Sequence, residues 1–232
     1  MCALMTKFSC KSIPFFSGLP DELLAEIDKN SKILSLNAGH LLLNGGKKSS
    51  YLMIVLKGTV LLNDHAGDGR VVGVSFVGSY ELLAWLNVID NKPLSQTIIT
   101  ASACELLICS VGFMQDLVKV HATLACRFLT HSADCFRRLE HTRAMLNLPN
   151  AFHRVFVQID QLSTLAQVGK TGLPNQQDIA NSVNTSRETV SRALNMLIKS
   201  GVLLKVGQKI VVNQPEKLKQ LAIDGPDALA GE

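Results

Sequence analysis

The sequence contains none of the short motifs that mark the common enzyme classes. It has no glycine-rich phosphate loop ending in lysine, no His-Glu-x-x-His zinc motif and no Gly-x-Ser-x-Gly turn around a nucleophilic serine. We therefore expect a protein that is not an enzyme and has no catalytic residues.

Long apolar runs are missing as well. No stretch reaches the roughly 18 consecutive apolar residues that are needed to span a bilayer. Residues Met1–Cys10 lack the basic start and the apolar run of a secretory signal. These absences predict a cytoplasmic protein that has no membrane partner.

The cysteines include no Cys-x-x-Cys pair. They are Cys2, Cys10, Cys104, Cys109, Cys126 and Cys135. Their spacings fit neither a zinc ribbon nor a standard iron–sulfur run, so no metal site is predicted. In a cytoplasmic protein such thiols are usually reduced and mostly buried.

Charge is scarce and nearly balanced. Only 18% of the residues are charged and the net charge is +4, whereas 47% are apolar and available for packed cores. This composition excludes a wholly disordered chain. The small basic excess permits nucleic-acid binding without demanding it.

Apolar runs separated by glycine fill the amino-terminal half, after a short helix that begins near Pro20. The runs are Lys32–Leu36, His40–Leu43, Tyr51–Leu56, Thr59–Leu62, Val71–Val77, Gln96–Ala101 and Cys104–Cys109. Short strands at this spacing predict an antiparallel β-roll over residues 1–110, with Asp64–Gly69 as a hairpin loop.

The hydrophobic period becomes helical over residues 111–148, where we expect one long helix. Its predicted apolar stripe is formed by Leu124, Phe128, His131, Cys135 and Leu139. Because a small roll cannot cover so long a helix, we expect the stripe to pair with a second copy. Packing on its own domain is the alternative. Leu148-Pro149-Asn150 then ends the helix and predicts a hinge.

The segment Pro174–Val212 has the pattern of a helix-turn-helix followed by a wing. Ala180 is small where two helices must approach closely, and Asn184 stands at the turn, where a positive φ is usual. Thr185 or Ser186 is placed to cap the second helix. The residues expected to face inward are Val190, Leu194, Leu197 and Ile198.

Two apolar runs after the second helix predict the wing. Val202–Val206 and Lys209–Val212 flank Gly207-Gln208, which has the composition of a hairpin turn. Residues 149–232 are therefore expected to form a winged helix-turn-helix domain.

Polar side chains gather at the start of the second helix. The candidates for reading bases are Arg187, Glu188, Ser191 and Arg192. A recognition helix brings its N-terminal residues to base edges in the major groove, where arginine can bind guanine and glutamate can accept from cytosine. Candidates for contacts to the DNA backbone are Gln177, Thr185, Ser186, Thr189 and Lys199. In the alternative interpretation Glu188 only completes a capping box and Arg192 forms a surface ion pair.

The run Ser186-Arg187-Glu188-Thr189-Val190-Ser191-Arg192, followed by Lys199-Ser200-Gly201, resembles the CRP/FNR family of bacterial transcription regulators. The resemblance covers nearly the whole chain, since the roll is similar to a cyclic-nucleotide-binding domain. Asn44-Gly45-Gly46 and Leu56-Lys57-Gly58 support that similarity. It implies an α+β homodimer that binds near-palindromic double-stranded DNA, and RNA polymerase as a protein partner.

The resemblance also places an effector pocket, with two departures. Its candidate residues are Gly78, Tyr80, Glu81, Ser95, Gln96 and Thr97. Members that bind cyclic AMP follow a Gly-Glu-Leu segment with an arginine that grips the phosphate, and this arginine is absent here. The usual mode of cyclic-AMP binding is therefore not expected. Cys2 and Cys10 are too few and too far apart for the iron–sulfur cluster of other members.

Several signals remain open. A haem could use His40, His65, His121 or His131, with Cys104 and Cys109 nearby in the roll. A thiol switch, an unrecognised small molecule and a constitutive regulator are the alternatives. We predict a DNA-binding regulator that an unidentified signal in the roll controls allosterically. A ligand-sensing module that acts through protein partners without binding DNA is the competing hypothesis.

Overall fold

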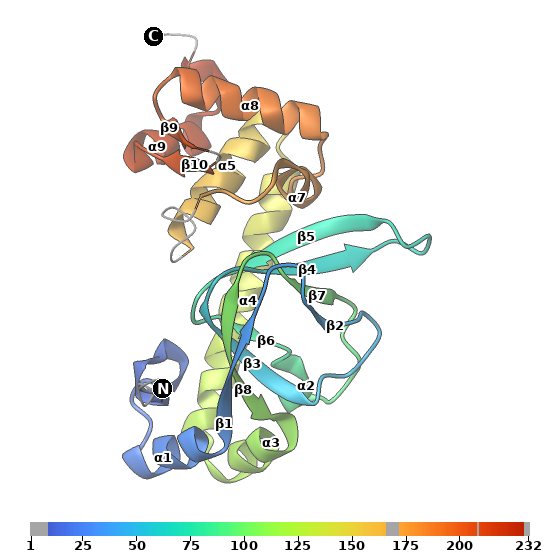
Figure 1. The fold of residues 1–232 in the computed structure, drawn as a ribbon, viewed down its shortest axis with the longest axis vertical. Coiled ribbons are helices and arrows are strands. Elements are labelled where there is room, and N and C mark those ends of the chain that lie inside the picture. The colour runs from blue at the N-terminus through green and yellow to red at the C-terminus, as the bar shows by residue number, and fades with distance from the viewer. Residues whose placement is uncertain (1–8, 166–171, 208, 230–232) are drawn as a thin grey trace, which may run out of the picture.

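Figure 1 shows the computed structural model of the chain, which describes residues 9–165, 172–207 and 209–229. An amino-terminal lobe of two sheets and a carboxy-terminal lobe made mainly of helices are joined by one long helix, α4 (Ala122–Leu146). The α+β fold expected from the sequence, with a roll, a long helix and a winged helix-turn-helix, is confirmed. Among the described helices, none combines the length and the hydrophobicity that a membrane span requires.

The roll consists of two four-stranded antiparallel sheets. One sheet has the order β1 (Ser31–Leu36), β8 (Cys104–Ser110), β3 (Tyr51–Lys57) and β6 (Leu82–Leu83). The other has the order β2 (Leu41–Leu43), β7 (Thr97–Thr100), β4 (Val60–His65) and β5 (Val71–Val77). Val55, Val60 and Leu106 are completely buried in a core to which both sheets contribute.

Gly58 makes the tight turn from β3 to β4. Its φ is +96°, and a Cβ at this position would lie 2.4 Å from the carbonyl oxygen of Ala103. Only glycine tolerates both the left-handed backbone and the close approach. The glycine turns that predicted the roll are therefore required by its geometry at this position.

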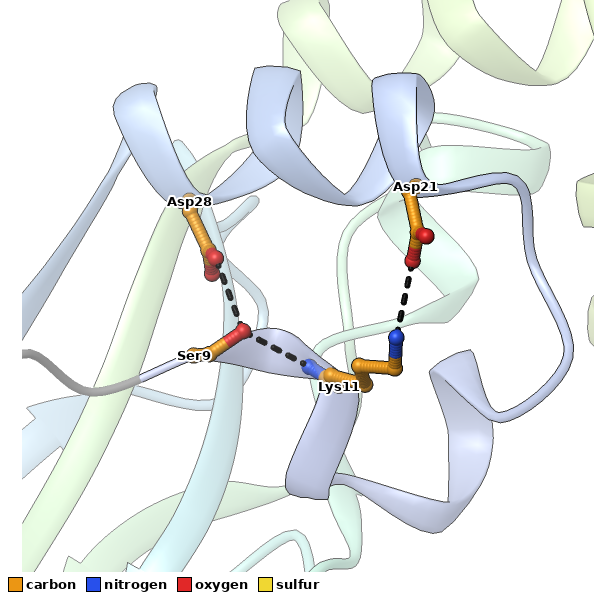
Figure 2. Close-up of polar contacts among 4 residues, drawn as sticks. All are labelled: Ser9, Lys11, Asp21 and Asp28. Carbon is orange, nitrogen blue, oxygen red and sulfur yellow. Dashed lines mark hydrogen bonds and ion pairs between the residues drawn. The ribbon is translucent and has the colours of Figure 1, made fainter.

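The first described residues are held against α1 (Asp21–Lys29), as Figure 2 shows. The Ser9 hydroxyl donates to Asp28 at 3.0 Å, and Lys11 Nζ lies 2.9 Å from Asp21. These bonds fix two short 3₁₀ turns, η1 (Cys10–Ser12) and η2 (Pro14–Phe16), beside the roll. Apolar residues of η1, η2 and α1 share a core with β3, β8 and the helices that follow them.

The single helix expected over residues 111–148 is wrong in one respect. It is divided at His121 into α3 (Val111–Val120) and α4, because His121 has an extended backbone with φ −113° and ψ 94°. The break lets Met114 of α3 and Phe128 of α4 reach the same core. A short helix that the sequence did not predict, α2 (Leu86–Ile89), also contributes to that core through Val88.

The carboxy-terminal lobe is built around one apolar core. Its elements are α5 (Ala151–Thr164), α7 (Gln176–Ser182), α8 (Arg187–Lys199), β9 (Leu203–Val206), β10 (Lys209–Val212), α9 (Pro215–Asp224) and η3 (Pro226–Leu229). β9 and β10 pair antiparallel as the expected wing, although Gln208 of the expected turn lies outside the described residues. The expected break at Leu148-Pro149-Asn150 separates α4 from α5, and the Asn150 side chain caps α5.

The two lobes contact each other beyond the α4 connection. Phe76 of β5 packs against the core of the carboxy-terminal lobe, and Gly78 faces Leu165. In Figure 1 the β4–β5 hairpin runs beneath α7. From α4, Met145 is only 3% exposed and is part of the carboxy-terminal core. The last turn of α4 thus packs with the lobe that follows it.

Candidate nucleic-acid interface

Two helices, α7 and α8, meet at a tight turn in the carboxy-terminal lobe. The Asn175 side chain caps α7 by accepting from the Asp178 N–H at 2.9 Å. Asn184 has a φ of +50°, and the Thr185 N–H donates to Ala180 at 3.0 Å. Asparagine tolerates this left-handed conformation better than most residues other than glycine, which explains its place at the turn.

Ser186 caps α8, one of the two residues expected to do so. Its hydroxyl accepts from the Thr189 N–H at 3.2 Å. The residues of α7 and α8 that pack between the helices and the rest of the lobe are Ile179, Ala180, Val190, Ala193, Leu194 and Leu197. Each is at most 2% exposed, so the predicted inward face of α8 is confirmed, with Ile198 half-buried at its edge.

The opposite face of α8 presents the four base-reading candidates near the helix start. Arg187, Glu188 and Arg192 are exposed, and Ser191 is half-buried beside them. Arg192 Nε makes only a long 3.4 Å contact to the Glu188 carbonyl oxygen of the same helix. The guanidinium groups therefore keep most of their donors directed toward solvent, where they can meet a ligand.

Glu188 lies beside the start of α8. Its own backbone N–H and then the Ser186 hydroxyl hold the pKa of its carboxyl below the usual value. The helix N-terminus favours a negative charge at this place. The capping role considered from the sequence thus coexists with an exposed carboxylate that can accept from a base.

The five candidates for DNA backbone contacts lie around the same turn, with one exception. Gln177 and Ser186 are exposed, and Thr185 and Thr189 are half-buried near the junction of α7 and α8. Gln177 Nε2 donates to Asn181 at 3.0 Å. Lys199 is the last residue of α8, and at 1.5 Å per residue it lies about 18 Å from the helix start.

Sequence reasoning missed one residue that contacts this turn. Arg154 of α5 donates to the carbonyl oxygens of Val183 and Asn184, at 3.0 and 3.2 Å. It also donates to Leu148, just beyond α4, at 2.7 Å. No local pattern marks this arginine, because its partners lie 6, 29 and 30 residues away.

Comparisons with known proteins match both lobes. The profile of a Crp-like helix-turn-helix domain matches residues 155–221, and that of a cyclic nucleotide-binding domain matches residues 33–121. The cAMP-activated global transcriptional regulator CRP of Pasteurella multocida is 30% identical over 183 residues, covering 74% of this chain and 85% of that protein. The chain belongs to the CRP/FNR family.

Other CRP/FNR relatives extend the match along the chain. The probable transcriptional regulator flp of Lacticaseibacillus casei is 26% identical over 92% of this chain and 98% of that protein. The structure of FixK2 from Bradyrhizobium japonicum shares the fold, with a TM-score of 0.70 at 17% identity over 82% of this chain and 96% of that one. The chain is thus a DNA-binding transcription regulator by class, and the relatives named here are transcription regulators.

Three of the six effector candidates of this CRP/FNR roll have side chains that bond within the chain, namely Gln96, Thr97 and Glu81. Thr97 Oγ1 accepts from the Gly45 N–H at 3.1 Å, next to Ser95, and Gln96 Nε2 donates to Asp64 at 3.2 Å. Gly78 lies against Leu165. Tyr80 has a φ of +67° and is 42% exposed.

Glu81 pairs with Arg138 of α4 at 3.6 Å. Burial raises the pKa of Glu81, and the Arg138 guanidinium partly offsets that rise. The Glu81 carboxylate is therefore directed toward the long helix α4.

The stripe expected to pair with a second copy lies on the inward face of α4 at four of its five positions, and two of these are completely buried. Leu124 and Phe128 are 0% and 1% exposed and pack in the core of their own chain, so they cannot contact another copy. His131 and Cys135 are half-buried on the same inward face, whereas Leu139 is 67% exposed. Because α4 has two apolar faces, the sequence pattern did not distinguish the face that packs on its own chain from the face that is exposed.

Most of the described cysteines and histidines lie at separate places in the fold. The described cysteines are free thiols, and burial raises the pKa of Cys10, Cys104 and Cys109. Cys2 lies outside the described residues. His131 contacts Cys135 and Trp85, while His40, His65 and His121 lie at separate places in the fold. Among the residues that the structure describes, no group of three or more His, Cys, Asp or Glu could hold a metal ion.

Proposed function

We propose that this chain acts as a homodimer that reads a near-palindromic DNA site through α8. One observation carries the proposal. Arg187, Glu188, Ser191 and Arg192 lie on the outward face at the start of α8, a helix that is capped by Ser186 and whose opposite face is buried. An α-helix fits the major groove, where its first residues reach the base edges. Thr185, Ser186 and Thr189 are placed to bind the flanking phosphates, and Gln177 and Lys199 to extend those contacts.

The homodimer is supported by a second face of α4. Leu129, Phe136 and Leu139 are 69%, 63% and 67% exposed, although burying each such side chain is worth about 1.5–3 kcal/mol. At 100° per residue, Leu129 and Phe136 lie about a third of a turn from the inward face of Leu124. Their spacing of seven residues suits pairing with the same helix of a second copy.

The dimer gives the two recognition helices a fixed separation. A two-fold axis along paired α4 helices makes the DNA site a near-palindrome with half-sites about one helical turn apart. A signal in the roll that changes the pairing or the position of the lobes would change that separation, which is the control we propose. RNA polymerase is the protein partner that the family resemblance implies.

The experiment is site selection from a random DNA library, followed by affinity measurements on the selected duplex. Arg192→Ala should weaken binding to that duplex by about 1–3 kcal/mol and should relax discrimination at one base of each half-site. Arg70→Ala is the matched control. Arg70 is an exposed arginine in the β4–β5 hairpin that pairs with Asp68 at 2.6 Å, and its loss should leave both quantities unchanged.

Two outcomes would contradict the proposal. If no duplex is selected, the competing hypothesis of a sensing module that acts without DNA is favoured. If a duplex is selected but Arg192→Ala binds it with the affinity and base preference of the parent, α8 does not read the site in this way.

A further inference from the structure

Arg154 makes three hydrogen bonds with one guanidinium. Nε and Nη2 donate to the carbonyls of Val183 and Asn184 in the turn before α8, and Nη1 donates to the carbonyl of Leu148. All three acceptors are main-chain oxygens, and the side chain is half-buried among them. One planar group thus bridges two segments that are more than thirty residues apart in sequence.

The two bridged segments are the ones whose relation decides where α8 points. Asn184 lies two residues before the α8 cap Ser186 and three before Arg187, so fixing its carbonyl fixes the start of the recognition helix. Leu148 lies two residues beyond the last residue of α4. Met145 of the same helix end is buried in the carboxy-terminal core. The end of α4 and the start of α8 are therefore linked through Arg154.

The apolar core of this lobe does not fix the same relation so closely. Ile179, Val190 and Leu197 are buried by non-directional packing, which tolerates small rotations of α8 against α5. Hydrogen bonds weaken steeply with angle, so three bonds from a rigid fork oppose such rotations. Lysine carries no such fork, and its single nitrogen cannot donate to three carbonyls in this planar arrangement.

From this geometry we infer that Arg154 is a positioning residue that sets the separation of the two recognition helices in the dimer. The inference rests on the proposed function, because only a dimer on DNA has such a separation. It predicts that Arg154 controls which spacing of half-sites the protein accepts, whereas Arg187 and Arg192 control which bases it accepts in each half-site.

The experiment compares duplexes whose half-sites stand at the selected spacing or one base pair closer or farther apart. One base pair moves a half-site by about 3.4 Å along the DNA axis. The parent should lose at least about tenfold in affinity for each displaced duplex. Arg154→Gln should lose about tenfold on the best duplex and should differ by less than about threefold among the spacings. Arg154→Lys should fall between the two proteins.

Base discrimination within a half-site separates positioning from general damage. It should stay within about twofold of the parent in both Arg154 variants, because α8 itself is unchanged. Arg70→Gln and Arg70→Lys are the matched controls and should keep the parent's spacing preference. If circular dichroism shows that Arg154→Gln does not fold, the Arg154→Lys data decide the question.

The outcomes separate this inference from the function on which it rests. A parent that binds no duplex overturns the proposed function and this inference with it. If the parent binds and both Arg154 variants keep its spacing preference, this inference alone is overturned. It is also overturned if Arg154→Lys loses base discrimination as strongly as spacing discrimination, because Arg154 is then structural.

Discussion

The two lobes differ in where their polar side chains find partners. In the carboxy-terminal lobe, Arg187, Glu188 and Arg192 are exposed at the start of α8. In the roll, three of the polar candidates for an effector pocket bond inside the chain. Gln96 donates to Asp64, and Glu81 pairs with Arg138 of α4. The helix-turn-helix lobe thus presents its charged candidates to solvent, whereas Gln96 and Glu81 of the roll are already bonded within the chain.

Polar and charged side chains therefore have two different roles in this protein, binding a partner and joining parts of the fold. A side chain that reads a partner must keep its hydrogen-bonding groups unused until the partner arrives. A side chain that joins two parts of the fold has its groups already satisfied. We therefore expect changes of the exposed side chains at the start of α8 to alter binding with little effect on stability, and changes at the roll–α4 junction to do the reverse.

The largest expected effect tests whether two copies of α8, one from each subunit of a dimer, bind the DNA together. Phe136→Glu places a charge on the outward face of α4 and should convert a dimer into a monomer. A monomer reaches only one half-site at a time, so affinity for the selected duplex should fall about 100-fold or more. Light scattering and duplex titration measure the two effects. Arg137→Glu, a charge change at the neighbouring position, is the control, and equal loss in both variants would argue against this face.

The next effect tests whether the two lobes unfold independently of each other. Leu106→Ala in the roll and Leu197→Ala in α8 each truncate a completely buried side chain, which costs about 2–5 kcal/mol. Trp85, the only tryptophan, lies in the amino-terminal lobe and reports on its unfolding. In urea titrations, Leu106→Ala should shift the Trp85 fluorescence transition more than Leu197→Ala does. Equal shifts would mean that the lobes unfold as one unit.

The smallest effect tests whether His131, a polar residue half-buried where α4 packs on the roll, contributes to stability. Burial, and then the Arg138 guanidinium, lower the pKa of His131, whose ring meets Trp85 edge-on at 5.0 Å. The unfolded chain therefore takes up a proton at higher pH than the folded chain. The stability contributed by neutral His131 is present above the unfolded pKa of about 6.5 and is lost as the pH falls through the folded pKa.

Between pH 7.5 and 5.5 the parent should thus lose about 1–3 °C in melting temperature more than His131→Gln does. Thermal unfolding across this range gives the comparison. His65→Gln, which removes an exposed histidine of the β4–β5 hairpin, should follow the parent. A parent and a His131→Gln variant with parallel profiles would contradict the assignment.

Local patterns account for most of the fold. The helix-turn-helix was predictable because capping residues, a left-handed asparagine and an apolar period all lie within twenty residues and agree with one another. The strands were predictable for a similar reason, since glycine turns delimit them. The division at His121 was not predictable, because it depends on which core residues α3 and α4 must both reach.

What failed depends on contacts between distant segments. The stripe of Leu124 and Phe128 was assigned to a partner because periodicity identifies an apolar face without identifying what covers it. The effector candidates follow a family pattern, but whether Glu81 meets a ligand or Arg138 depends on how α4 crosses the roll. Arg154 carries no local signal at all, since its acceptors are backbone oxygens.

One turn of α4 belongs to both lobes at once. Arg138 pairs with Glu81 of the roll, and three residues later His141 bonds to Gln161 of α5 at 2.8 Å. These attachments are about 4.5 Å apart along the helix axis. Together with the contacts of Phe76 and Gly78 to the carboxy-terminal lobe, these two bonds put the attachment points of both lobes within one turn of α4. A change in the position of the roll would therefore act on the carboxy-terminal lobe over one helical turn and would not need the whole length of α4.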